Sequence, residues 1–131
     1  MRNIPVGAKG TFSLSVLPQH LANQFKDAML PPVFSTPMMV LAMENAALNA
    51  IKPYLEAGES AVGTEVDVRH LAATPVGHDV TAEAEVTGVD GRRVTFKISA
   101  RDEREEIGSG THERMVVDLA RLSQRLTAKS K

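Results

Sequence analysis

The stretch STPMMVLAMENAALNA, residues 35 to 50, carries one acidic side chain among mostly apolar neighbours. Burial of an unpaired carboxylate is costly, so Glu44 needs either a charged partner or a solvated site in which the carboxylate takes part in the chemistry. As a structural acid it would pair with Arg69 or Arg114. As a working group it would act as a general base or orient one. The residues alone leave both interpretations of Glu44 open.

Two other side chains, those of Thr36 and His70, are also of chemical interest. Thr36 precedes Pro37, a pair typical of a helix start, where threonine serves as N-cap and the missing amide hydrogen of proline costs nothing. His70 falls on the inward face of a predicted strand, where a histidine is more often a hydrogen-bonded core residue than a catalyst. Eight helical residues rise about 12 Å, so Thr36 and Glu44 cannot touch within one regular helix. Contact between them would need a bent helix entry or a partner chain.

The predicted elements are one strand, one long helix and four further strands. Alternation predicts a strand at 11–16, followed by an irregular or short-helical excursion between Pro18 and Pro32 that could act as a flap. The helix runs from Thr36 to about Lys52 or Leu55. Strands then fill the chain from Ser60 to a basic, amphipathic tail near 119, with turns at 90–91 and 101–106. The expected inward faces are Val62, Thr64, Val66, Val68 and His70, then Val80, Ala82, Ala84 and Val86, and then Val94, Phe96, Ile98 and Ala100.

An antiparallel sheet with one long helix on its face is an α+β architecture, and 131 residues match a single domain over residues 1–131. The helix is apolar nearly all round, so one sheet would cover only part of it. A second subunit, most simply in a two-fold homodimer, would cover the rest.

Composition narrows the function classes. A formal net charge of -1 gives no polybasic surface, so we expect no nucleic acid and no anionic membrane as partner. The chain has no cysteine, and its four histidines show no paired spacing, so we expect no metal site. There is no Gly-rich nucleotide motif, no signal peptide and no apolar run long enough to cross a membrane, which makes the cytoplasm the expected location.

Four stretches together resemble a known family: VFSTPMMVLAMENAA, VGTEVDVRHLAATPVG, VDGRRVTFKISARDE and EIGSGTHERMVVDL. Over about residues 33–120 the chain resembles the hotdog-fold thioesterases of the fluoroacetyl-CoA thioesterase type, and GTHER and HxAATP are the specific parts of the match. The resemblance implies a hotdog fold, in which a long central helix is wrapped by an antiparallel sheet of about five strands. It also implies a homodimer, with a tetramer as a further option, an active site at the subunit interface and acyl-CoA as substrate.

The resemblance further implies that Thr36, Glu44 and His70 form the catalytic set. Gly63 and Arg114 match positions that line the acyl pocket or the site.

Two departures from the family pattern concern specificity. Leu30 stands at the place of the aromatic gate of the fluoroacetyl-specific type, and Pro37 replaces a glycine. Both bear on selectivity for the fluoroacetyl group more than on thioester hydrolysis.

The expected activity is hydrolysis of a small or short-chain acyl-CoA, with no resident cofactor and CoA as part of the substrate. Either Thr36 is the nucleophile, or Glu44 and His70 activate water while Thr36 binds. The alternatives are a non-catalytic acyl-CoA-binding module and a hydratase on the same fold, although the Asp/His pair of a hydratase is not visible. We expect His112 to be structural, and Arg92, Arg93 and Lys97 to be candidate contacts for CoA phosphates.

Overall fold

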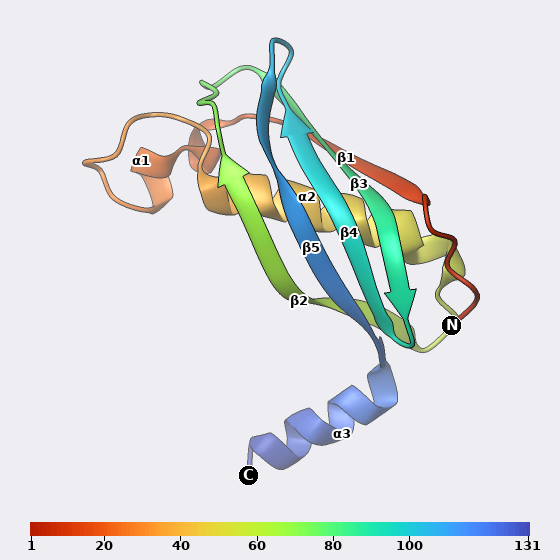
Figure 1. Cartoon of the computed structure of the whole chain (residues 1–131). Coiled ribbons are helices and arrows are strands. Elements are labelled where there is room, and N and C mark those ends of the chain that lie inside the picture. Colours follow the sequence, from red (N-terminus) through yellow and green to blue (C-terminus); the bar gives the residue numbers. More distant parts are fainter.

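The structure, a computed structural model, describes residues 1–131 in full. One five-stranded antiparallel sheet, in the order β1-β3-β4-β5-β2, curls around the long helix α2 (Figure 1). Helix α2 spans Thr36–Ile51 and continues into a 3-10 turn at Lys52–Tyr54. The strands are β1 (Lys9–Ser15), β2 (Glu59–His70), β3 (Asp79–Asp90), β4 (Arg93–Arg101) and β5 (Glu106–Asp118). This confirms the α+β architecture and the helix wrapped by five strands.

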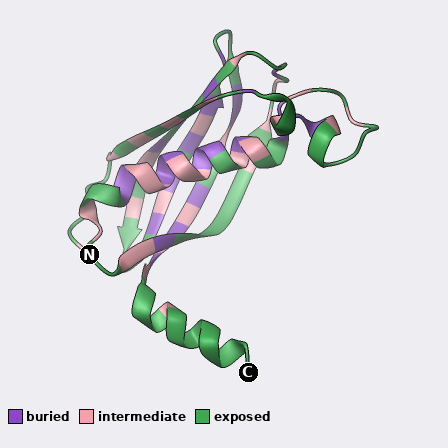
Figure 2. Cartoon of the chain, turned by 180° about the vertical axis from the view of Figure 1, so that it is seen from behind, coloured by how far each residue is buried: buried purple, intermediate pink, exposed green.

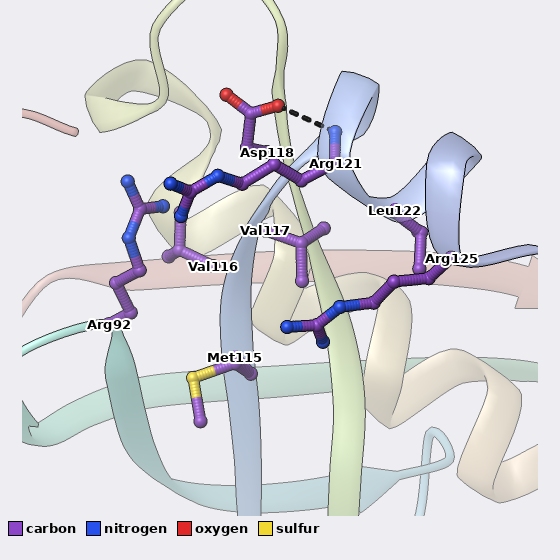
Figure 3. Close-up of a pocket in the computed structure, with 8 residues that line it drawn as sticks. All are labelled: Arg92, Met115, Val116, Val117, Asp118, Arg121, Leu122 and Arg125. Atoms are coloured by element: carbon purple, nitrogen blue, oxygen red, sulfur yellow. Dashed lines mark hydrogen bonds between the residues drawn. The ribbon is translucent and has the colours of Figure 1, made fainter.

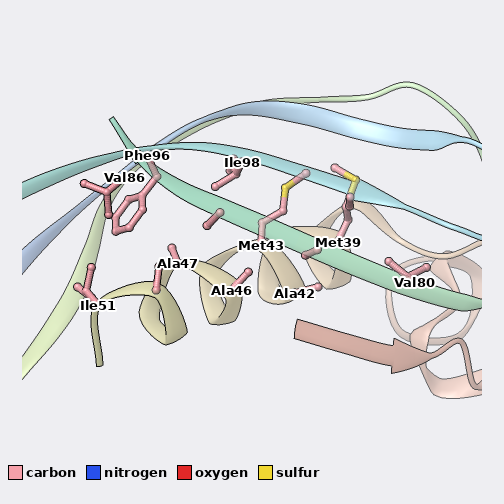
Figure 4. Close-up of a cluster of buried hydrophobic side chains, with 14 of the residues drawn as sticks. Met39, Ala42, Met43, Ala46, Ala47, Ile51, Val80, Val86, Phe96 and Ile98 are labelled. Atoms are coloured by element: carbon pink, nitrogen blue, oxygen red, sulfur yellow. The ribbon is translucent and has the colours of Figure 1, made fainter. Parts of the chain in front are cut away.

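The hairpin of β3 and β4 forms as the alternation predicts. Ala84 lies opposite Ile98 and Val86 lies opposite Phe96, and all four side chains point to the helix side of the sheet and are buried. Figure 4 shows Val86, Phe96 and Ile98 above the methionines and alanines of α2. Gly91, in the turn, has φ 61°, a left-handed conformation that glycine adopts without a steric penalty.

Helix α2 begins one residue earlier than it would if Thr36 were its N-cap. Ser35 has the extended backbone of an N-cap, with φ -79° and ψ 152°, and its carbonyl accepts the hydrogen bond of the Met39 amide. A hydrogen bond from the Ser35 amide to the His20 carbonyl holds this residue in the extended form. Thr36 is therefore the first helical residue, and the prediction that it is the N-cap was wrong.

The two faces of α2 have different surroundings. The face toward β1, β3 and β4 is fully buried and is formed by Met39, Ala42, Met43, Ala46, Ala47 and Ile51. On the opposite face Leu41 is 41% exposed and the Glu44 side chain is 39% exposed, because the chain's own sheet covers this face only in part. Figure 2 shows the same alternation of buried and exposed positions along the helix. Within one chain Glu44 is thus not buried, contrary to the simplest interpretation of its apolar neighbours.

Strand β2, at the edge of the sheet, has an irregularity that the alternation did not reveal. Its pairing with β5 shifts by one residue between Gly63 and Glu65, which reverses the face to which the following side chains point. Val62 lies opposite Met115 and points to the outer face of the sheet, whereas His70 points inward as predicted. The expected common face of Val62 and His70 is therefore wrong, and the bulge is the reason.

The remaining segments are short. The excursion before α2 contains a 3-10 turn at Pro18–His20 and the single-turn helix α1 (Ala22–Phe25). Helix α3 (Leu119–Lys129) follows β5 and leaves the end of the sheet on the side of β2 (Figures 1 and 2). The Asp118 carboxylate caps α3 by accepting a hydrogen bond from the Arg121 amide at 3.0 Å. None of the helices has the length and apolar character that a membrane span requires.

Candidate active site

Thr36 and His70 meet where α2 begins and β2 ends. The Thr36 hydroxyl oxygen lies 2.8 Å from His70 Nδ1, which is hydrogen-bonding distance. Burial lowers the pKa of His70 below its ordinary value, while the nearby backbone of Ala72 acts in the opposite direction. A neutral imidazole can accept the hydroxyl proton at Nδ1, so the pair has the arrangement of an oxygen nucleophile or ligand beside a base.

This pair lies in an open hollow of about 250 Å³. The side of the imidazole away from Thr36 is enclosed, since His70 Nε2 is buried and has no hydrogen-bond partner within the chain. The hollow is lined by Val33, Thr36, His70, Leu71, Ala72 and Ala73. Its mostly apolar lining suits a short acyl group next to the Thr36 hydroxyl.

Glu44 lies in a second hollow, of about 290 Å³, on the uncovered face of α2. Its Oε2 is 3.5 Å from Nη1 of Arg114, so the predicted pairing of Glu44 with Arg114 is present in the structure. The Arg114 side chain is 8% exposed, and its Nη2 donates to the Ala61 carbonyl at 2.6 Å. The hollow is lined by Pro37, Leu41, Glu44, Asn45, Leu48 and Arg114.

Gly63 makes room for this ion pair. A Cβ atom at position 63 would lie 2.8 Å from Oε2 of Glu44, closer than such contacts occur, and 3.6 Å from Nη1 of Arg114. A side chain at this position would displace the carboxylate. Gly63 therefore contributes to the second hollow by its lack of a side chain.

His112 joins the same cluster, although we expected it only to be structural. Its Nδ1 lies 2.7 Å from the Glu65 carbonyl oxygen, and its Nε2 lies 3.2 Å from Nη1 of Arg114. Its ring stacks on Phe96, with centroids 5.6 Å apart. The signal in the sequence is the spacing in GTHER, because residues 112 and 114 of one strand share a face.

Burial also sets the charge of His112. It lowers the pKa of the imidazole below its ordinary value; the Glu65 carbonyl opposes this, and the positive charge of Arg114 adds to it. His112 is consequently neutral near pH 7. Burial likewise lowers the pKa of Arg114, against the pull of Glu44, yet a guanidinium stays protonated at neutral pH.

These shifts predict a pH dependence of stability. Because burial lowers the pKa values of His70 and His112 from 6.5, the unfolded chain binds protons below pH 6.5 that the folded chain does not. The two histidines therefore leave the unfolding free energy unchanged above pH 6.5 and reduce it below, by at most about 1.4 kcal/mol per pH unit each. Urea unfolding between about pH 7.5 and 5.5, at fixed protein concentration, measures the effect.

The variant His112→Gln should lose less of its unfolding free energy over the same pH range. Carboxylates with lowered pKa values, such as Glu59, titrate below 4.5 and do not contribute there. An equal decline in His112→Gln and in the unchanged protein would contradict the assignment to His112.

The candidate residues thus form two groups within a chain. Thr36 and His70 form one, and Glu44, Arg114 and Gly63 form the other. No hydrogen bond joins Glu44 to His70, and the two hollows share no lining residue. Leu30 lies in the loop between α1 and α2 and lines neither hollow.

A third hollow, of about 310 Å³, lies on the outer face of the sheet between β5 and α3. Figure 3 shows the guanidinium groups of Arg92, Arg121 and Arg125 around its apolar floor. Arg92 is already paired with Glu59 at 3.4 Å. The hollow contains none of the candidate catalytic side chains, which lie on the other face of the sheet. No group of three or more His, Cys, Asp or Glu side chains could hold a metal ion anywhere in the chain.

A long helix enclosed by a curled five-stranded sheet, with a hydroxyl–imidazole pair at its start, defines a hotdog-fold protein of the thioesterase superfamily. Residues 16–120 match the family described as fluoroacetyl-CoA-specific thioesterase. The chain belongs to this family.

Individual relatives agree with this membership. The chain is 48% identical over 103 residues to the fluoroacetyl-CoA thioesterase of Streptantibioticus cattleyicolor, covering 79% of this chain and 74% of that protein. The solved structure of the fluoroacetyl-CoA thioesterase FlK matches with a TM-score of 0.91 at 41% identity, over 97% of this chain and 98% of that one. A thioesterase superfamily member from Thermus thermophilus matches with a TM-score of 0.90 at 33% identity, over 98% and 97% of the two chains.

Proposed function

We propose that the protein is an acyl-CoA thioesterase that hydrolyses a small or short-chain acyl-CoA to the free acid and CoA. The observation that carries the proposal is the 2.8 Å contact between the Thr36 hydroxyl and Nδ1 of a partly buried, neutral His70. The contact lies at an open, mostly apolar hollow. Family membership and the relatives named as thioesterases support the same reaction. The proposal treats residues 1–131 as one domain acting in the cytoplasm.

Thioester hydrolysis needs a base, a place for the developing oxyanion and a leaving group. His70 Nδ1 accepts the proton of the attacking oxygen, which is either that of Thr36 or that of a water held by it. The positive end of the α2 dipole faces the negative charge that forms on the carbonyl oxygen. Pro37 offers no amide hydrogen, so backbone donors at this end come from its neighbours. The CoA thiolate is a good leaving group and needs little acid assistance.

We further propose that the protein works as a homodimer whose active sites each use both subunits. Leu41 on α2 and Val62 and Val66 on β2 leave exposed apolar surface around the edge strand, and a second copy would cover it. Glu44 and His70 occupy separate hollows within one chain. Pairing across the two-fold axis would place the Glu44 of one subunit beside the Thr36 and His70 of the other. Association of two dimers into a tetramer is compatible with this arrangement.

The proposed activity can be tested with a panel of acyl-CoA esters of graded length, in which release of free thiol is followed over time. We expect acetyl-type thioesters to turn over and long-chain thioesters to turn over slowly, because the apolar hollow of about 250 Å³ is small. Binding of acyl-CoA without thiol release would instead support a non-catalytic binding module. Fluoroacetyl-CoA belongs in the panel because Leu30 replaces an aromatic gate.

The shared site predicts complementation between two inactive variants. Co-expressed His70→Ala and Glu44→Gln chains, carrying different affinity tags, would form mixed dimers in which one of the two sites has both residues. Random pairing should then restore about a quarter of the activity of the unchanged dimer. If each site were built from one chain, every site in the mixture would lack a residue. The preparation would then be as inactive as the parent variants.

A further inference from the structure

The bulge in β2 orients the ring of His112. Because the pairing of β2 with β5 shifts between Gly63 and Glu65, the Glu65 carbonyl lies within 2.7 Å of His112 Nδ1. A carbonyl oxygen can only accept a hydrogen bond, so Nδ1 must carry the proton. In a neutral imidazole this leaves Nε2 as an acceptor. The backbone therefore selects one tautomer of His112.

Arg114 lies between this acceptor and the carboxylate of Glu44. Its Nη1 is 3.2 Å from His112 Nε2 and 3.5 Å from Glu44 Oε2, and its Nη2 donates to the Ala61 carbonyl. A guanidinium has only donors, so each hydrogen bond in the series from Glu65 through His112 and Arg114 to Glu44 has a fixed direction. The Glu65 carbonyl accepts from His112, and both His112 and Glu44 accept from Arg114.

In this series of hydrogen bonds, His112 and Arg114 are held much more firmly than Glu44. His112 is 2% and Arg114 7% exposed, and the His112 ring is stacked on Phe96. The Glu44 side chain is 39% exposed and has Arg114 as its one hydrogen-bond partner within the chain. A displacement of the guanidinium would therefore move the carboxylate, whereas the solvent around Glu44 would not hold it in place.

We infer that His112 is a positioning residue, which acts through Arg114 to fix the Glu44 carboxylate for hydrolysis. The inference rests on the proposed function, because it assigns His112 a role in the site that uses Glu44. It predicts that the tautomer of His112 and the acceptor at its Nε2, rather than the bulk of the ring, determine the rate.

A double-mutant cycle tests this coupling. His112→Asn can keep the donor to the Glu65 carbonyl but loses the acceptor for Arg114, and it should lower kcat about tenfold with little change in KM. His112→Gln can present an acceptor near the Nε2 position and should recover most of the lost kcat. In a Glu44→Gln background, His112→Asn should lower kcat no further. His78→Asn, at a histidine bonded to Glu103 on the surface, is the matched control and should be unchanged.

A fall in kcat caused by His112→Asn that is equally large in the Glu44→Gln background would overturn the inference. Loss of thermal stability with unchanged kcat would do the same. These failures differ from failure of the proposed function, in which the unchanged protein would release no thiol from any acyl-CoA in the panel.

A second measurement needs no substitution in His112. In the unchanged protein, nitrogen NMR of the histidine rings should show His112 neutral and protonated at Nδ1 at pH 7. Protonation at Nε2 would prevent the hydrogen bond from Arg114 and would refute the inference even if the variants fail to fold.

Discussion

Replacement of His70 by alanine should reduce the turnover of acetyl-type CoA thioesters at least about a hundredfold, the usual weight of a general base. The imidazole lies 2.8 Å from the Thr36 hydroxyl and is the one titratable side chain in the first hollow, so no neighbour there can take its place. Steady-state thiol release from the purified variant measures the loss. Circular dichroism and size-exclusion chromatography should show the fold and the assembly of the unchanged protein.

The surface variant His78→Ala controls for the loss of an imidazole as such, and its turnover should be unchanged. Two substitutions of Thr36 then separate the two routes of attack. If the Thr36 oxygen is the nucleophile, Thr36→Ser keeps measurable activity and Thr36→Val loses it. If a water attacks, both variants keep part of the activity. A folded His70→Ala protein with unchanged turnover would remove His70 from the mechanism altogether.

The fold could be predicted from the sequence because its main signals are local. The alternation in the β3–β4 hairpin, the turn at Gly91 and the apolar run of α2 each need only a few neighbouring residues to be recognised. The bulge in β2 could not be predicted in this way. It depends on pairing with β5, and a glycine followed by a polar residue within an alternating stretch does not by itself indicate a shifted register.

Less of the site than of the fold could be predicted from the sequence. The residue types of Thr36, Glu44 and His70 suggested chemistry, and their joint assignment came from the resemblance to a family. The contact of Thr36 with His70 needs the end of β2 to pack against the start of α2, which no local pattern specifies. The exposure of Glu44 has a similar cause, because an apolar helix indicates that something covers it but not whether its own sheet or a second subunit does so.

Exchange of Glu44 for glutamine should also reduce turnover at least about a hundredfold and leave the protein folded. Glutamine has nearly the same shape, and its carbonyl oxygen can still accept a hydrogen bond from Arg114, so the buried guanidinium keeps a partner. What the variant loses is the negative charge and the ability to accept a proton. Glu85→Gln, on the exposed surface of β3, is the matched control and should keep full activity. If Glu44→Gln had normal turnover, the role of the Glu44 carboxylate would be only structural, as the partner of Arg114.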